Sequence, residues 1–160
     1  VAHSSSLHFT VVKPTAIARP KILQKVAANN ELDILERDFF NKAVERFNEI
    51  FALAHKIDVK ILVDAEESLI QDAIDQIVLK MMLKYNKEKA IVYNTSQMYR
   101  HDRLKYLNSL TEIAKKEDIF IGIKLVRGAY IENENKRALK NNYNSLLQIC
   151  GAFLSLILFH

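Results

Sequence analysis

Apolar residues recur along the chain at two spacings, one typical of strands and one typical of helices. Short runs rich in β-branched residues predict four strands, at 9–12, 59–63, 90–93 and 119–126. Apolar residues three or four positions apart predict helices at about 20–28, 33–56, 66–85 and 98–116, and a charged helix from about 132. Asp33 and Glu36 have the spacing of a capping box, which indicates where the second helix begins.

The order of these elements predicts the fold class. Strands that are separated by helices form parallel sheets. A complete barrel takes roughly 250 residues, whereas this chain has 160. We therefore predict an α/β fold of the (β/α)8 TIM-barrel type, present as a partial barrel of about four β/α units. A doubly wound sheet is the alternative, although the chain has only three glycines and no glycine-rich phosphate turn.

Polar residues follow or end each predicted strand. Lys13 follows the first strand, Asp64 the second and Asn94 the third, while the fourth carries Lys124 and runs into Arg127. Because the carboxyl ends of parallel strands gather at one rim, we expect these residues to form a site there. The alternative is that each strand simply ends where polar sequence begins.

Several polar residues also have a structural interpretation. Glu66 and Glu67 are acids at a helix N-terminus, where they complement the helix dipole. Asn94 could instead cap the helix that follows it, and Arg100 and Arg103 are expected on a solvated helix face. The residues alone leave three roles open for Lys13: a Schiff-base lysine, an anchor for a carboxylate or a solvated strand end.

Composition and charge exclude several classes of function. The chain carries a net charge of +4, with Lys and Arg interspersed among Asp and Glu, so we expect no nucleic-acid partner. A weak attraction to an anionic membrane surface remains compatible with this charge. The single Cys150 excludes an internal disulfide and suits a reducing compartment. The histidines lack the spacing of zinc ligands, so no metal site is expected.

Four segments together resemble proline dehydrogenase, the FAD-dependent enzyme of proline catabolism. They are 12–16 (Val-Lys-Pro-Thr-Ala), 62–68 (Leu-Val-Asp-Ala-Glu-Glu-Ser), 94–100 (Asn-Thr-Ser-Gln-Met-Tyr-Arg) and 124–130 (Lys-Leu-Val-Arg-Gly-Ala-Tyr). They occur in the order found in that family. The resemblance implies a distorted (β/α)8 barrel with FAD across the rim and no Rossmann turn, which agrees with the few glycines.

The resemblance also implies a reaction. L-proline would be oxidised to Δ1-pyrroline-5-carboxylate, with hydride transfer from proline C5 to flavin N5. The electrons would pass to a quinone or another acceptor, with a membrane surface as one place for it. The implied location is cytoplasmic or peripheral to the inner membrane in a bacterium, and mitochondrial in a eukaryote. The oligomeric state is left open.

The same resemblance implies roles for individual residues. Asp64 and Lys124 would be catalytic, and Lys13 would bind the proline carboxylate. The implied contacts with FAD are Ala65, Asn94, Lys124, Arg127, Gly128 and Ala129.

The chain also departs from the family pattern. Ser96 stands where an aromatic residue is usual, Pro14 where an apolar residue is common and Ala18 where Gly is frequent. A late arginine pair that grips the proline carboxylate has no match. We assign residues 1–145 to the N-terminal part of the barrel, and 146–160 to an apolar C-terminal tail that does not belong to the family fold.

These differences from the family pattern leave alternative explanations for the tail and for the function of the chain. The tail is expected to follow a truncation or a change of reading frame, and its alternatives are a buried terminal helix and a membrane-surface anchor. The chain itself could be a truncated, non-catalytic remnant that binds flavin or acts as an interaction module. A third hypothesis for the function is a lysine-dependent, aldolase-like barrel, which the four motifs disfavour.

Overall fold

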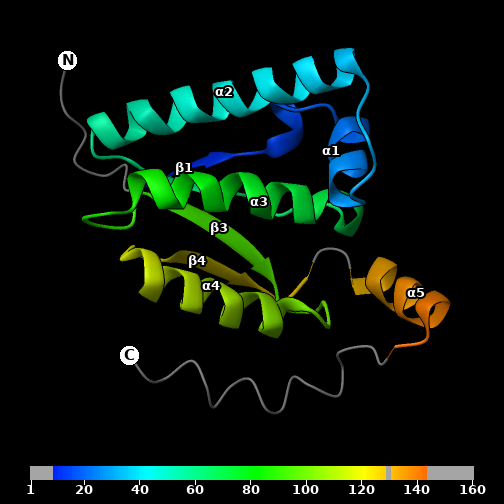
Figure 1. Ribbon diagram of the computed structural model, residues 1–160. Helices are drawn as coiled ribbons and strands as arrows, with labels where there is room; N and C mark the ends of the chain where they lie inside the picture. The colour runs from blue at the N-terminus through cyan, green and yellow to red at the C-terminus, as the bar shows by residue number, and fades with distance from the viewer. Residues whose placement is uncertain (1–8, 129–130, 144–160) are drawn as a thin grey trace.

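The computed structural model describes residues 9–128 and 131–143, in which parallel strands alternate with helices (Figure 1). The strands are β1 (Phe9–Val12), β2 (Lys60–Val63), β3 (Val92–Gln97) and β4 (Gly122–Val126). The helices are η1 (Pro14–Ala16), α1 (Pro20–Ala27), α2 (Ile34–Lys56), α3 (Ser68–Tyr85), α4 (Arg103–Glu117) and α5 (Ile131–Asn141). Asp33 and Glu36 form the predicted capping box at the start of α2.

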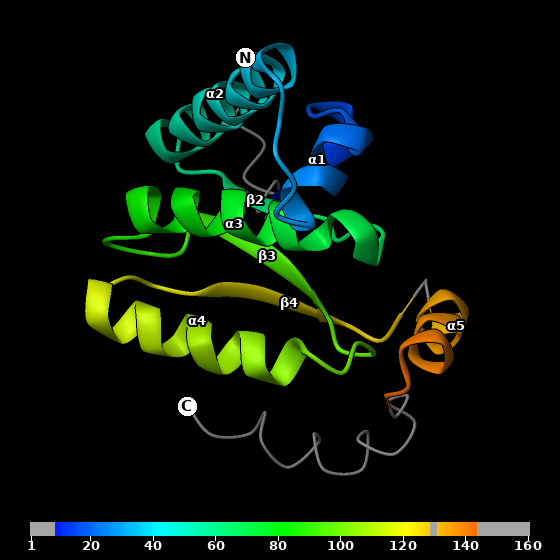
Figure 2. The same ribbon diagram turned by 45° about the vertical axis from the view of Figure 1, so that its right-hand side comes forward.

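The strands lie in the sheet in the same order as in the sequence, β1-β2-β3-β4, and all neighbours are parallel. Their carboxyl ends point toward the side of the molecule where α1 and α5 lie, as both ribbon views show (Figures 1 and 2). A doubly wound sheet would reverse its strand order partway. The predicted partial barrel of the TIM type is therefore confirmed, and the doubly wound alternative is wrong.

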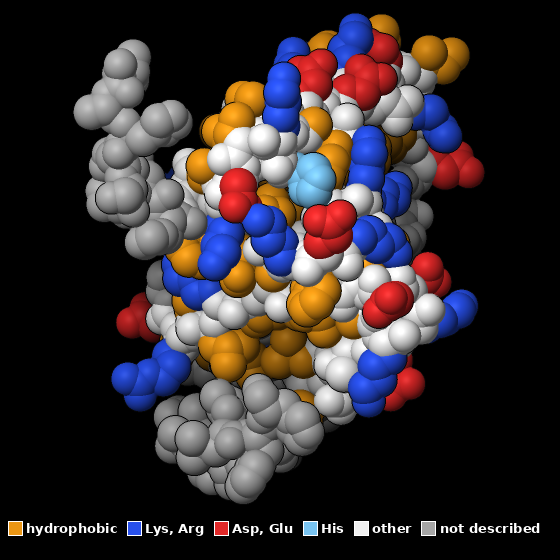
Figure 3. Space-filling view, turned by 90° about the vertical axis from the view of Figure 1, so that its left-hand side faces the viewer, with side chains coloured by type: hydrophobic (Ala, Val, Ile, Leu, Met, Phe, Trp, Pro, Cys, Tyr) orange, Lys and Arg blue, Asp and Glu red, His pale blue; other side chains and the backbone are white. Residues whose placement is uncertain are grey.

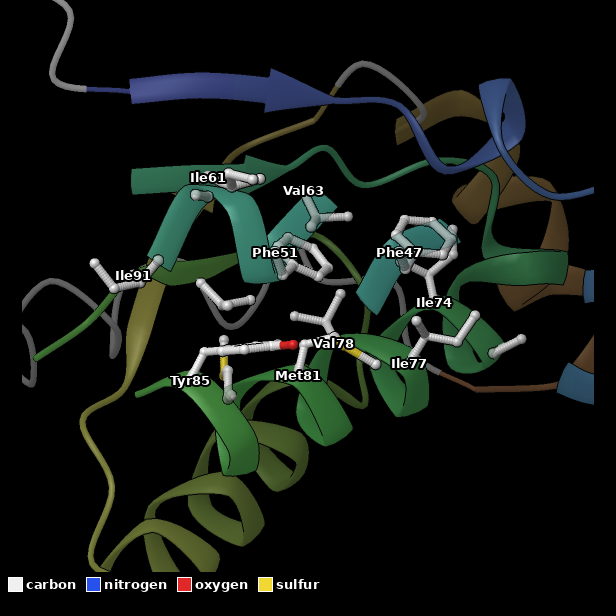
Figure 4. Packing of buried hydrophobic residues seen from close by; sticks show 14 of the residues in the cluster. Phe47, Phe51, Ile61, Val63, Ile74, Ile77, Val78, Met81, Tyr85 and Ile91 are labelled. Atoms are coloured by element: carbon white, nitrogen blue, oxygen red, sulfur yellow. The ribbon is translucent and has the colours of Figure 1, made fainter. Parts of the chain in front are cut away.

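The hydrophobic core lies on the face of the sheet that the helices cover. Ile61 and Val63 of β2 are buried there against Phe47 and Phe51 of α2, which point between the strand and α3 (Figure 4). Val11 lies on the opposite face, where it remains 53% exposed. One face of the sheet is thus packed, while the face that would line a barrel is partly open.

Gly122 is required by a close approach on the inner face. A Cβ atom at this position would lie 2.6 Å from Cγ of Tyr93 on the neighbouring strand. The glycine therefore lets the Tyr93 ring lie across β4.

Strand β3 is longer than the sequence predicted. The expected strand at 90–93 in fact begins at Val92 and continues to Gln97, so Asn94 lies inside it rather than at its end. Its polar side chains are satisfied where they stand, since Asn94 donates to Asp75 and Thr95 donates to the Val63 carbonyl. A strand can continue through buried polar side chains when those side chains have hydrogen-bond partners. The polar residues after position 93 therefore predicted the end of β3 too early.

The start of α4 also differs from the prediction, because the helix begins at Arg103 rather than near residue 98. Arg100 and Arg103 are buried, not solvated as expected. Arg100 donates to Asp72 and Asp102, and Arg103 donates to Asp102 and Asp75. Burial alone would raise the pKa of Asp102, but the hydrogen bonds from the two arginines outweigh it and hold that pKa well below its usual range.

The surface at the amino ends of the strands carries Lys and Arg interspersed with Asp and Glu, and hydrophobic side chains gather in its lower part (Figure 3). Within residues 9–128 and 131–143, none of the helices has both the length and the apolar character needed to cross a membrane. The predicted tail, 146–160, lies outside the described residues.

Candidate functional site

A cavity of about 460 Å³ lies at the carboxyl ends of the four strands. Its lining residues come from the ends of all four strands or from the turns that follow them: Lys13, Thr15, Asp64, Ala65, Glu66, Thr95, Gln97, Tyr99, Lys124 and Val126. The predicted residues Lys13, Asp64, Ala65 and Lys124 are therefore brought together, although up to 111 positions separate them in the sequence.

The sheet itself brings the strand ends level with one another. The backbone N–H of Asp64 donates to the Val12 carbonyl, which extends the pairing of β1 and β2 to the edge of the cavity. Thr95 lies opposite Lys124 in the pairing of β3 and β4. Alternate residues of a strand share a face, so Thr95, Gln97, Lys124 and Val126 all line the cavity.

Asp64 and Lys124 form an ion pair across the cavity. Lys124 Nζ lies 3.4 Å from Asp64 Oδ1, and the two side chains are 46% and 29% exposed. Such a solvated pair contributes little to stability, about 0 to 1 kcal/mol. Both charges therefore remain usable for a ligand that enters the cavity.

Lys13 supplies a second cation to the same cavity. It is exposed directly after β1, and within residues 9–128 and 131–143 no carboxylate lies at ion-pair distance from it. A lysine of this kind can anchor an anionic group such as a carboxylate.

Gln97 is a cavity residue that the sequence analysis missed. It is buried, and its Nε2 donates to the Glu66 carbonyl at 2.6 Å. Its Oε1 is buried without a hydrogen-bond partner among the described residues. An unpaired buried acceptor costs about 1 to 3 kcal/mol, so a donor on a ligand would relieve it. The sequence signal that could have found Gln97 is its spacing of two residues from Thr95, which places both side chains on one face of a strand. This spacing is informative only if the predicted strand continues past Asn94.

Asn94 is not among the residues that line the cavity. Its Nδ2 donates to Asp75 Oδ1 at 2.8 Å and to the Tyr106 hydroxyl at 2.9 Å, on the face that α3 and α4 cover. Asn94 and its neighbour Thr95 lie on opposite faces of β3, so Thr95 lines the cavity and Asn94 does not. The contact of Asn94 with a cofactor stays a prediction.

Arg127 and Gly128 follow β4 but do not line the cavity either. Gly128 has a φ of 132°, a conformation that favours glycine. A Cβ there would lie 2.6 Å from the ring of Tyr99, which does line the cavity. Gly128 therefore shapes the cavity wall through Tyr99, whereas Ala129 lies outside the described residues.

A second, larger cavity of about 580 Å³ lies between the start of α3 and α5. Glu134 of this cavity accepts from the Tyr143 hydroxyl through Oε1 at 2.9 Å, and its Oε2 lies 3.5 Å from Arg137 Nη1. Glu134 Oε2 and Arg137 Nη1 are both buried without a hydrogen-bond partner among the described residues. Burial, together with the hydrogen bond to Glu134, raises the pKa of Tyr143 to about 12. None of its lining residues belongs to a strand, and Tyr99, in the turn after β3, lines both cavities.

Comparison with known proteins identifies relatives of the chain. A family model described as proline dehydrogenase matches residues 2–149. Proline dehydrogenase 1, mitochondrial, of Drosophila melanogaster is 44% identical over 108 residues, which are 68% of this chain and 16% of that protein. The carbapenem antibiotics biosynthesis protein CarD of Pectobacterium carotovorum is 33% identical over 133 residues, 83% of this chain and 35% of that protein. The chain therefore spans between about a sixth and a third of these relatives.

Solved structures share the fold. Proline utilization A (PutA) from Bdellovibrio bacteriovorus superposes with a TM-score of 0.65 at 20% sequence identity, over 84% of this chain and 13% of that one. PutA from Bradyrhizobium japonicum gives a TM-score of 0.64 at 19% identity, over 82% of this chain and 13% of that one. At this identity the likeness supports the barrel arrangement alone.

Proposed function

The chain belongs to the proline dehydrogenase family, and from this premise we propose that its rim cavity forms part of a site that oxidises L-proline to Δ1-pyrroline-5-carboxylate with FAD. The observation that carries the proposal is that Lys13, directly after β1, and Asp64, directly after β2, line the same cavity as Lys124, which lies within β4. Rims of this kind carry the active sites of TIM barrels.

Three charged residues of the cavity have a part in the proposed reaction. Lys13 binds and orients the carboxylate of proline, which fixes the ring for reaction. Lys124 stabilises negative charge that develops on the cofactor. Asp64, 3.4 Å from the Lys124 ammonium, holds that side chain at the cavity. Arg127, Gly128 and Ala129 remain predicted cofactor contacts.

The residues of the cavity fit a flavin. Gln97 offers a buried acceptor without a partner among the described residues, which suits an N–H donor of the ring. Ala65 adds no bulk to the lining beside Asp64, and Lys124 supplies a cation. When bound, FAD supplies the acceptor for the hydride that leaves proline C5.

The acceptor of the electrons is proposed to be a quinone or another oxidant, with a membrane surface as one place for the transfer. In a eukaryote we propose a mitochondrial location, as the names of the Drosophila and human relatives state for those proteins.

The proposal is tested by adding FAD to the purified chain and then proline without oxygen. We expect a protein-bound flavin spectrum whose long-wavelength band bleaches on addition of proline. Asp64→Ala and Lys124→Ala should slow the bleaching at least about a hundredfold, because each removes a charge from the cavity. The absorbance at that band, followed in a stopped-flow instrument, gives the rate.

Glu67→Ala is the matched control, since Glu67 is an exposed carboxylate next to the site that does not line this cavity. Equal effects of the three substitutions would contradict the assigned roles. A chain that binds no flavin would instead support a remnant that acts as an interaction module.

A further inference from the structure

We propose that Glu66 is a positioning residue that fastens the turn after β1 to the segment after β2, beyond the last backbone pairing of Asp64 with Val12, and so holds Lys13 in place at the cavity. Its consequence for flavin binding rests on the function proposed above. The sequence offered another explanation for Glu66, as an acid at a helix N-terminus.

The helix-terminus explanation does not describe the bonds that Glu66 makes. Helix α3 begins at Ser68, its N-cap residue is Glu67, and no acidic residue lies in its first turn. Glu66 precedes the helix and lines the cavity instead. Its carboxylate is therefore engaged across the rim rather than with the helix that follows it.

The side chain of Glu66 joins two strand ends. Its Oε1 accepts hydrogen bonds from both the backbone N–H and the hydroxyl of Thr15, each at 3.0 Å, across 51 positions of sequence. Thr15 lies in η1, whose first hydrogen bond runs from the Ala16 N–H to the Lys13 carbonyl. Because η1 is a tight turn, the position of Thr15 fixes the backbone of Lys13.

The backbone of Glu66 is held from two further elements. Its N–H donates to Gln71 Oε1 of α3 at 2.9 Å, and its carbonyl accepts from Gln97 Nε2 of β3 at 2.6 Å. Gln71 is fully buried and in turn donates to Asp75, which lies 2.6 Å from Arg103 of α4. Glu66 is thus anchored to the packed side of the sheet before it reaches across to Thr15.

These contacts make Glu66 the junction of the rim segments that carry Lys13 and Asp64. Asp64 lies two residues before Glu66, and Lys13 lies two residues before Thr15. A carboxylate that accepts two donors resists displacement more than a neutral acceptor does. Loss of the side chain should free the β1 turn while it leaves the Asp64 segment bound to Gln71 and Gln97.

The test uses the 160-residue chain and compares Glu66→Ala with Glu66→Gln. Both substitutions remove the negative charge, but only Glu66→Gln keeps an acceptor oxygen. Amide hydrogen exchange of Thr15 is measured by NMR without FAD. In Glu66→Ala the Thr15 amide should exchange at least about tenfold faster, because its acceptor is gone. Glu66→Gln should retain protection, since its carboxamide oxygen still accepts. Glu67→Ala is the matched control and should leave the rate unchanged.

The Ala18 amide serves as an internal reference. It donates to the Pro14 carbonyl, so it should stay protected in all variants if η1 remains folded. FAD affinity, measured by quenching of flavin fluorescence, should weaken about tenfold in Glu66→Ala and stay within about twofold in Glu66→Gln.

Unchanged Thr15 exchange in Glu66→Ala would overturn the positioning role, as would equal FAD affinity of Glu66→Ala and Glu67→Ala. A wild-type chain that fails to bind FAD would overturn the proposed function of this chain. In that case the exchange of Thr15, which needs no flavin, still decides whether Glu66 fastens the rim.

Discussion

At the scale of single residues, Asn86 shows how one buried amide can hold two strands in place. Its Oδ1 accepts from the backbone N–H groups of Ile91 and Val92 at 3.0 and 2.9 Å. Its Nδ2 donates to the carbonyls of Val92 and Phe120 at 3.0 and 2.9 Å. Asn86 therefore joins the start of β3 to the segment before β4, through four bonds that no sequence pattern indicates.

Asn86→Ala should lower the free energy of unfolding by about 3 kcal/mol, because it leaves several buried backbone groups without partners. Urea denaturation followed by circular dichroism measures this loss. Asn108→Ala, at an exposed position of α4, is the control and should change stability by less than about 0.5 kcal/mol. Similar losses in the two variants would argue against the role of Asn86.

At the scale of elements, the start of α4 depends on charges rather than on helix propensity. Its N-cap residue, Asp102, makes no capping hydrogen bond to the helix backbone. Its carboxylate instead accepts from Arg100 and Arg103, and these arginines also reach Asp72 and Asp75 on α3. The network therefore joins α3 to α4 behind the rim.

Asp102→Asn should lower the free energy of unfolding by about 2 kcal/mol at pH 7, because it removes hydrogen bonds to a charged group. The pKa of Asp102 is lowered in the folded chain, whereas the unfolded chain keeps a value of about 3.9. Below about pH 4 the unfolded state therefore binds a proton that the folded state does not, so the stabilisation is progressively lost. Thermal denaturation between pH 7 and pH 3 measures the difference between the two proteins.

That difference in stability should narrow as the pH falls, and a difference that widens would contradict the interpretation. Asp38→Asn is the control, since Asp38 is half exposed and forms an i,i+4 ion pair with Lys42 on the same helix. Its effect should stay below about 0.5 kcal/mol at every pH.

At the scale of the whole molecule, the sheet formed by the described residues has two edge strands, β1 and β4. Within the described residues, β1 pairs only with β2 and β4 pairs only with β3. Phe9 and Val11 of β1 are 43% and 53% exposed on or beside the open inner face. Unpaired edges with exposed apolar residues tend to pair with another chain.

We therefore expect the isolated chain to self-associate as its concentration rises. Val11→Lys places a charge on the β1 edge and should raise the dissociation constant at least about tenfold. Sedimentation velocity over a range of concentrations measures the association. Leu104→Lys, at a similarly exposed apolar position on α4, is the control and should have little effect. A wild-type chain that stays monomeric at all concentrations would contradict the expectation.

Local sequence patterns were enough to predict the strand and helix order, the partial barrel, and the places of Lys13 and Asp64 directly after strands and of Lys124 within the fourth strand. These features are local, since hydrophobic periodicity reports one element at a time and the ends of parallel strands must share a rim. The length of β3, the burial of Arg100 and the inward side of Gln97 were decided only by the tertiary structure. Each depends on partners distant in sequence: a polar side chain ends a strand unless another element satisfies it, and only the folded chain supplies that element.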